Sequence, residues 1–219
     1  MLPRLPPLLL SLTSLTAAAD DTRWRLDTVH TQIQFSIDHQ GFNRSLGQFK
    51  LREGALVFDE KDWSSARVTA SVDTASLYLG DAKWEETVRS WRYLNAERWP
   101  LAQFRSLSVQ RGEGNSGVIH GELELHGQRR PLDIAFRFNK LANDPYTFKR
   151  TVGFSATATL RRSDFGMDKV LSAIGDEVQL RLEVTAVRDK DAEPGSPPAG
   201  DTSPTPAQDQ EGNDGTEKR

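Results

Sequence analysis

The feature that most constrains this fold is an alternation of apolar and polar residues that recurs along the middle of the chain. It is clearest over residues 33–37, 68–72, 119–125, 132–138, 152–160 and 178–186. Residues two apart in a strand lie on the same face, so this period predicts antiparallel strands with one apolar face. Together with residues 24–26 and 46–58, the pattern indicates about eight strands.

A sheet of this size with a single apolar face tends to close on itself, because closure removes the unpaired edges and buries the apolar side. We therefore expect an all-β, extended antiparallel eight-stranded barrel, with a two-sheet sandwich as the alternative. The alternation does not decide whether the interior is packed solid or hollow. Small residues on the inward faces would leave volume, but barrels also use small residues to fit their taper: Ala70, Gly121, Ala156, Ala158 and Ala186.

One segment departs from the period of two. In "GDAKWEETVRSWRYLN", residues 80–95, Trp84, Val88 and Trp91 have the spacing of one helical face. Asp81 can cap the first turn. We expect one amphipathic helix here, lying across an opening or a flank of the barrel.

The two ends of the chain differ from the middle. Residues 1–19 combine Arg4, a short apolar run and the small-residue pair Ala17 and Ala19, which predicts a signal peptide cut after Ala19. The apolar run is shorter than the ~20 residues that span a bilayer. Residues 190–219 are rich in proline and acidic residues, which predicts a disordered tail. The folded domain is expected over residues 20–189, in a periplasmic or secreted protein.

Composition narrows the classes of function. The chain has 28 basic and 31 acidic residues, and the excess of acid lies in the tail, so the expected domain is neutral. A neutral domain lacks the basic surface that nucleic acid binding requires. There is no cysteine, so disulfides, thiol chemistry and cysteine-ligated metals are excluded.

No motif indicates an enzyme. The four histidines, His30, His39, His120 and His126, lack the close spacing of a zinc motif. The chain contains no G-x-S-x-G elbow, no glycine-rich phosphate loop and no dinucleotide fingerprint. We expect no metal, no cofactor and no catalytic residue.

Five stretches in order resemble the YceI-like family of exported, lipocalin-like polyisoprenoid-binding proteins. They are "LDTVHTQIQFSIDHQGF", "RSWRYLNAERWPLAQF", "GELELHGQRRPLDI", the stretch "GFSATATLRRSDFG" and "GDEVQLRLEV". The match covers roughly residues 24–188. Its most specific part is Gly153–Thr157 followed by Arg162–Gly166.

The resemblance implies a lipocalin-like barrel that holds a polyisoprenoid lipid, such as a quinone or a prenyl phosphate, in its bore. The inward residues expected to contact that lipid are Phe35, Ile37, Phe104, Leu123, Leu125, Ile134, Phe136 and Phe154. His39, Arg162 and Asp164 are expected at the mouth or the headgroup. For the corner itself, the first expectation is an Arg162–Asp164 pair with Phe165 tucked under the turn.

Two other functions stay open at this point. A scaffold with a packed barrel would work through its tail, and an enzyme acting on a lipid headgroup would use His39 or His126 as a base near Asp27 or Asp164. The segment of residues 81–87 also departs from the family pattern, so the choice of headgroup is open. The oligomeric state is open as well, with a dimer as one option.

Overall fold

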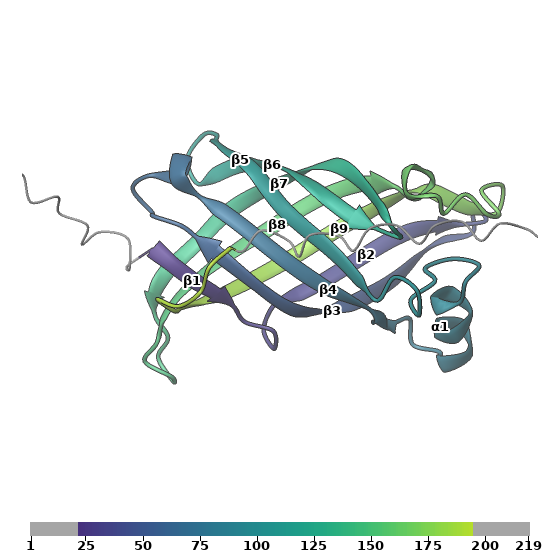
Figure 1. The fold of residues 1–219 in the computed structure, drawn as a ribbon, viewed down its shortest axis with the longest axis horizontal. Coiled ribbons are helices and arrows are strands. Elements are labelled where there is room, and N and C mark those ends of the chain that lie inside the picture. Colours follow the sequence, from purple (N-terminus) through teal and green to yellow (C-terminus); the bar gives the residue numbers. More distant parts are fainter. Residues whose placement is uncertain (1–21, 195–219) are drawn as a thin grey trace, which may run out of the picture.

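Nine antiparallel strands form one closed sheet in the computed structural model, which describes residues 22–194 (Figure 1). The order is β1-β3-β2-β9-β8-β7-β6-β5-β4, and pairing of β3 with β4 closes the ring. The expected signal peptide of residues 1–19 and residues 195–219 of the expected tail lie outside the described residues. The strands are β1 Arg23–Leu26, β2 Gln32–His39, β3 Asn43–Val57, β4 Arg67–Tyr78, β5 Leu101–Arg111, β6 Ser116–Leu125, β7 Gln128–Asn143, β8 Arg150–Arg161 and β9 Ile174–Arg188.

The nine strands fill eight positions around the barrel. Both β1 and β2 pair with β3 on one side and β9 on the other, so they are two halves of one strand interrupted by residues 27–31. The predicted all-β, eight-stranded antiparallel barrel with one helix is confirmed.

Strand β5 was not among the runs that the alternation identified. A bulge between Ser106 and Ser108 shifts the register of β5 against β6 and breaks its period of two. The expected number of strands was nevertheless right, because the interrupted strand β1/β2 supplied two of the runs.

One end of the barrel is closed by interlocked aromatic rings, which we call the aromatic plug: Phe58, Trp63, Phe136, Phe138 and Phe154. Phe58 is central, with ring centroids 5.1 Å from Phe154 and 5.5 Å from Phe138. Trp63 is held by a short 3₁₀ turn, Trp63–Ser65, that Asp62 caps, and the Arg111 guanidinium lies 4.4 Å from its ring centroid. All five rings are buried, so this end of the barrel is a conventional hydrophobic core.

Helix α1, Ala82–Arg89, lies at the opposite end of the barrel (Figure 1). The Asp81 carboxylate accepts a 2.8 Å bond from the Trp84 amide, as expected of a cap. Glu85 accepts bonds from the amides of Leu79 and Gly80 and ties the helix to the end of β4. The helix is shorter than expected and ends before Trp91, which is 75% exposed, so the expected helical face that included Trp91 is wrong.

The first residues of the expected tail lie against the barrel. Ala192 is only 3% exposed, and Glu193 forms a 2.7 Å ion pair with Arg23. Arg25 and Asp189 form a second pair beside it. No helix among residues 22–194 is both long enough and apolar enough to span a membrane.

We predict that Phe58→Ala lowers the free energy of unfolding by about 3–5 kcal/mol, because it opens a cavity among rings that already fill the plug. Phe35→Ala, at the opposite end, should cost only about 1–2 kcal/mol, since its ring borders open volume. Urea unfolding of both variants checks this. Equal losses would show that both ends are packed alike.

Candidate functional site

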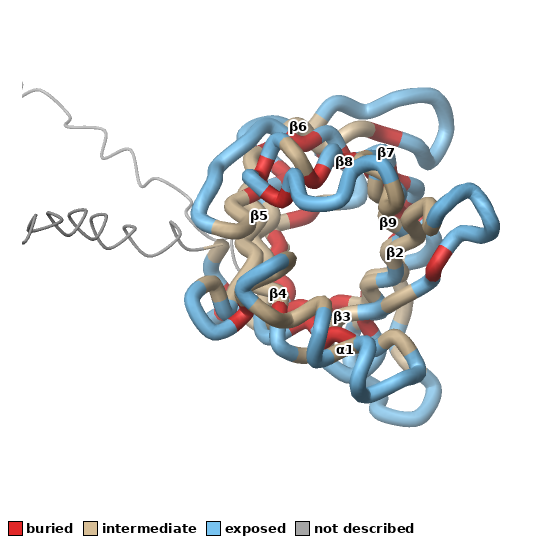
Figure 2. Tube along the Cα trace, turned by 90° about the vertical axis from the view of Figure 1, so that its right-hand side faces the viewer, coloured by how far each residue is buried: buried red, intermediate tan, exposed pale blue. Residues whose placement is uncertain are grey.

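Seen end-on, the strands form a closed ring (Figure 2). Two adjoining cavities lie inside this ring. The one near α1, here the mouth chamber, measures about 230 Å³, and the one near the aromatic plug, the inner chamber, about 180 Å³. Four side chains border both and form the waist between them: Ile33, Val72, Leu123 and Leu180. The barrel is therefore hollow along its axis.

The inner chamber is almost entirely apolar. Thr31 and Arg67 are the polar residues on its wall, and the Thr31 hydroxyl donates to the Thr185 carbonyl. Phe58, Phe136 and Phe154 form its floor and belong also to the plug. Small side chains at Ala66, Ala70 and Ala156 leave the volume that larger residues would fill.

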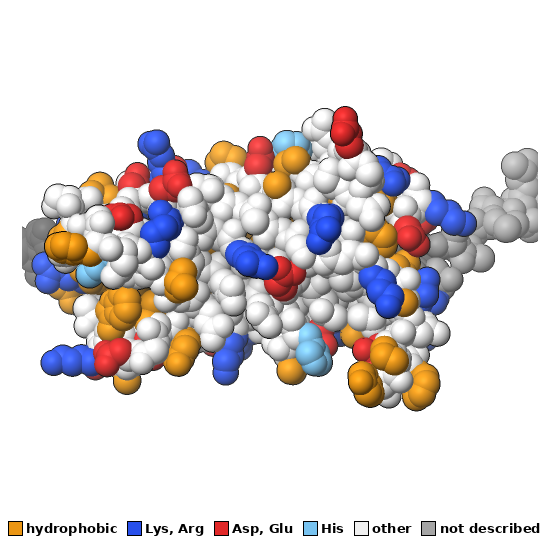
Figure 3. Space-filling model, turned by 180° about the vertical axis from the view of Figure 1, so that it is seen from behind, with side chains coloured by type: hydrophobic (Ala, Val, Ile, Leu, Met, Phe, Trp, Pro, Cys, Tyr) orange, Lys and Arg blue, Asp and Glu red, His pale blue; other side chains and the backbone are white. Residues whose placement is uncertain are grey.

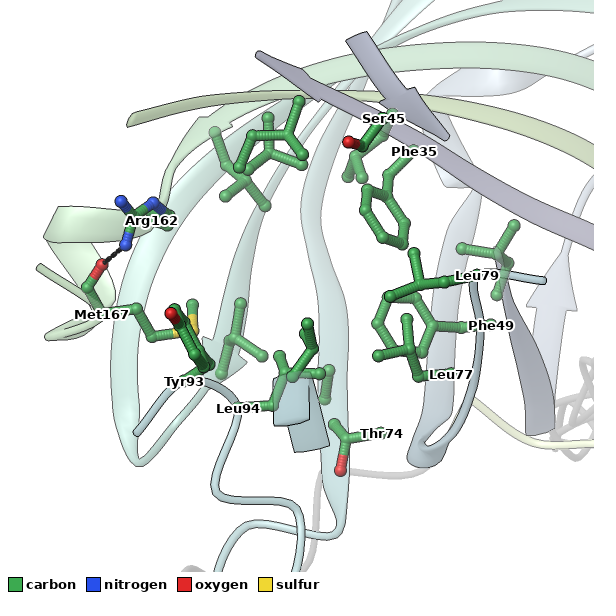
Figure 4. Close-up of a pocket in the computed structure, with 18 of the residues that line it drawn as sticks. Phe35, Ser45, Phe49, Thr74, Leu77, Leu79, Tyr93, Leu94, Arg162 and Met167 are labelled. Carbon is green, nitrogen blue, oxygen red and sulfur yellow. Dashed lines mark hydrogen bonds between the residues drawn. The ribbon is translucent and has the colours of Figure 1, made fainter. Parts of the chain in front are cut away.

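Most of the polar side chains that border the bore lie on the wall of the mouth chamber. Its wall includes His39, Ser45, Thr74, Tyr93 and Arg162, set among apolar side chains such as Phe35, Phe49, Leu77 and Leu79 (Figure 4). The Thr74 hydroxyl is engaged, because it donates a 2.7 Å bond to the Trp99 carbonyl. Within residues 22–194, the hydroxyls of Ser45 and Tyr93 form no hydrogen bond. Both chambers are mainly apolar, and the few polar side chains that border the bore are concentrated at the mouth.

Arg162 organises the loop that borders the mouth. It follows β8 in the short turn Arg162–Phe165, and its side chain is buried although it carries a charge. The guanidinium donates to four backbone carbonyls: Met167 (Figure 4), Lys169 at 2.9 Å, Ile174 at 2.8 Å and Gly175 at 2.9 Å. Burial lowers the pKa of Arg162, but arginine stays protonated in proteins.

The expected partner of Arg162 is not found. Asp164 is exposed, forms no ion pair within the described part of the chain and lines neither chamber. The acid that braces the corner is Asp176, which accepts 2.9 and 2.8 Å bonds from the amide and hydroxyl of Ser163. Burial alone would raise the pKa of Asp176, but these hydrogen bonds outweigh it and lower that pKa. Phe165 is buried under the turn, as expected.

The structure brings all eight expected bore residues to the cavity walls. Phe35, Ile37 and Leu125 line the mouth chamber, and Leu123 is at the waist. The remainder line the inner chamber: Phe104, Ile134, Phe136 and Phe154. His39 and Arg162 lie on the mouth chamber wall, as expected of mouth residues.

Several wall residues were not predicted. Phe49 continues the alternation of β3 and could have been found from it. Tyr93, Leu94 and Met167 come from segments without periodicity, so no sequence pattern placed them at the mouth. Trp84 and Val88 belong to the predicted helical face, and the position of α1 at the mouth brings them to the chamber wall.

The other three histidines lie in turns or on the outer surface, and each ring contacts a neighbouring oxygen. His30 contacts Asp27 at 2.7 Å, His120 contacts Asp133 at 2.8 Å, and His126 lies 3.0 Å from the Phe165 carbonyl. Hydrogen bonding to Asp27 raises the pKa of His30. Among residues 22–194 no three His, Asp or Glu side chains cluster as metal ligands would.

Comparison with known proteins places the chain among a large set of relatives. The family model of the YceI-like domain matches residues 24–186. A UPF0312 protein of Pseudomonas paraeruginosa is 34% identical over 172 residues, which cover 78% of this chain and 89% of that protein. A protein of Salmonella arizonae named YceI is 32% identical over 184 residues, or 83% of this chain and 95% of the relative.

Solved structures share the fold. BcnA of Burkholderia cenocepacia has a TM-score of 0.66 at 22% identity and covers 73% of this chain and 98% of its own. A domain of Saccharophagus degradans, described as a polyisoprenoid binding domain implicated in plant cell wall breakdown, has a TM-score of 0.59 at 12% identity. That alignment covers 77% of this chain and 99% of the domain.

We predict that Arg162→Met destabilises the fold by about 3 kcal/mol or more, because buried carbonyls lose their donors. Asp164→Asn should change the free energy of unfolding by less than about 0.5 kcal/mol, since that side chain is exposed. Chemical denaturation compares the two. A large loss from Asp164→Asn would restore the expected Arg162–Asp164 pair.

Proposed function

Because the chain belongs to the YceI-like family and its barrel encloses two adjoining apolar chambers, we propose that it binds a long-chain isoprenoid lipid in the bore. The protein would act as a binding and carrier protein rather than an enzyme. The observation that carries the proposal is the bore itself, which consists of two adjoining, mainly apolar chambers with most of its polar side chains near the mouth.

An elongated apolar cavity suits a chain better than a compact ligand. Each buried methylene contributes about 0.8 kcal/mol, so three to four prenyl units would contribute roughly 12–16 kcal/mol. That range offsets an association cost of about 4–15 kcal/mol with little help from polar contacts. The inner chamber has almost no polar group that could orient a small polar molecule.

The distribution of polar groups supports one orientation of the lipid, with its tail in the inner chamber and its headgroup at the mouth. His39, Tyr93 and Arg162 lie on the mouth chamber wall. Four of the five N–H groups of the guanidinium are used by carbonyls, which leaves one donor. A quinone or a prenyl phosphate would offer oxygen acceptors to these groups.

The polyisoprenoid binding domain of Saccharophagus degradans supports the same ligand class, since that domain shares this fold. The cellular part of the proposal rests on residues 1–19, whose signal peptide pattern would send the protein to the periplasm. A lipid carrier there would shield an isoprenoid chain from water between membranes.

The direct test is to produce the full chain with its own leader, purify it from the periplasm without detergent, and analyse an organic extract by mass spectrometry. We expect one prenyl lipid per barrel and an N-terminus at Asp20. An empty extract from a folded protein that also takes up no added prenol would contradict lipid binding. A retained leader would contradict the export alone.

We predict that filling the inner chamber shortens the longest chain that the protein accepts. Ala70→Phe adds bulk to that chamber, so the dissociation constants of long prenols should rise about ten-fold or more while short prenols change little. Ala102→Phe fills the mouth chamber and should weaken all lengths.

Ala135→Phe is the matched control, because Ala135 lies on the outer face of β7 and is exposed. A titration series of prenols of increasing length gives the comparison. If Ala70→Phe and Ala135→Phe bind the whole series equally well, the inner chamber does not hold the tail.

A further inference from the structure

Five of the large apolar side chains that are exposed on the described barrel lie at its mouth. Phe42 is 86% exposed in the β2–β3 turn, and Trp91 is 75% exposed just after α1. Trp84 in α1 is 37% exposed, and Val170 and Leu171 in the β8–β9 loop are each 42% exposed. We call these five residues the mouth rim: Phe42, Trp84, Trp91, Val170 and Leu171.

Direct contacts join the three segments that carry the rim. The Gln40 amide donates a 2.7 Å bond to the Ala173 carbonyl, which joins the β2–β3 turn to the β8–β9 loop. The His39 and Trp84 rings lie 6.2 Å apart and join the same turn to α1. His39, Trp84 and Ile174 also line the mouth chamber, so the rim surrounds the opening of the bore.

The loop that carries Val170 and Leu171 is held in position. Arg162 binds the carbonyl of Lys169, directly before them, and the Val170 carbonyl accepts from the amides of Ala173 and Ile174. Val170 has a φ of +55°, which a β-branched residue rarely adopts. Backbone strain of this kind persists only where surrounding contacts enforce it. The loop therefore holds Val170 and Leu171 in a defined position.

Charges around the rim are balanced. Exposed basic and acidic side chains lie on or next to the same three segments in similar numbers: Arg44, Lys83, Arg92 and Lys169 against Asp81, Glu86, Asp164 and Asp168. Figure 3 shows the mixture at the mouth end, where hydrophobic side chains lie among basic and acidic ones. A strongly anionic or strongly cationic partner would gain little electrostatic binding energy from such a surface.

We propose that the mouth rim docks on the surface of a zwitterionic bilayer, with its apolar tips inserted among the headgroups and the bore open to the lipid. Tryptophan and phenylalanine at loop tips suit this interface, since their rings are stable at headgroup depth. Balanced charge makes the attachment dependent on apolar insertion and nearly independent of salt.

The arrangement of the tips favours a bilayer over a protein partner. The rim residues are distributed around an opening, whereas the core of a stable protein interface is packed as closely as a protein interior. A fluid headgroup layer accommodates separate tips. The docking proposal rests on the proposed function. If the bore holds a water-insoluble chain, that chain has to enter the mouth from a lipid phase.

The test measures co-sedimentation of the full exported protein with phosphatidylcholine vesicles. We expect binding that changes less than about two-fold between low and high salt. The double variant F42S/W91S should partition about ten-fold more weakly. The matched control is Y146S/F148S, which removes two aromatic side chains, 89% and 80% exposed, from the turn between β7 and β8 at the opposite end.

Brominated phosphatidylcholine adds a local readout. It should quench Trp84 and Trp91 but not Trp24 and Trp63, which are buried away from the mouth. Extraction of prenyl lipid from F42S/W91S keeps the two proposals separate, because Phe42 and Trp91 do not line the bore. Retained lipid with lost vesicle binding supports docking through the rim.

Three outcomes would overturn the docking proposal while leaving lipid binding intact. One is a wild-type protein that carries lipid but does not sediment with vesicles. Another is equal binding by F42S/W91S and by Y146S/F148S. The last is binding that needs anionic lipid and disappears in salt, which would assign the attachment to charge instead.

Discussion

The pairing of β3 with β4 is the constraint on which the rest of the structure depends. It joins the two ends of the sheet, so every strand is hydrogen-bonded on both sides and the interior is left to side chains alone. In a barrel of this size the volume of those side chains decides whether a cavity remains. Aromatic rings fill the bore at the plug, whereas Ala70, Ala102 and Ala156 leave it open further along.

The two ends of the barrel then serve different purposes. Aromatic packing is concentrated at the plug, where the rings meet in tilted and edge-to-face contacts. The mouth is built from the helix and turns, and its polar groups face the bore or bind loop carbonyls. This division separates the closely packed end from the end that would contact the proposed lipid.

Much of the fold was predictable because a half-buried strand leaves a period of two in its residues. The eight bore residues followed from that period together with the family resemblance, and all of them line the chambers. The features that the sequence did not predict lie in segments without a clear period of two. The bulge in β5 erased its alternation, and the spacing that linked Trp91 to α1 could not show where the helix would end. The hollow interior was also undecided, since small inward residues are compatible with a packed or an open bore.

Arg162 shows why the corner after β8 could not be interpreted from neighbouring residues. Sequence proximity suggested Asp164 as its partner, but its hydrogen bonds reach carbonyls from Met167 to Gly175. Four carbonyl dipoles can solvate a buried guanidinium without a carboxylate beside it. The same side chain borders the mouth chamber and fixes Lys169, next to the rim residues Val170 and Leu171. A headgroup that contacted Arg162 would therefore touch the residue that holds the loop of Val170 and Leu171, so the proposed lipid site and the mouth rim are joined through one side chain.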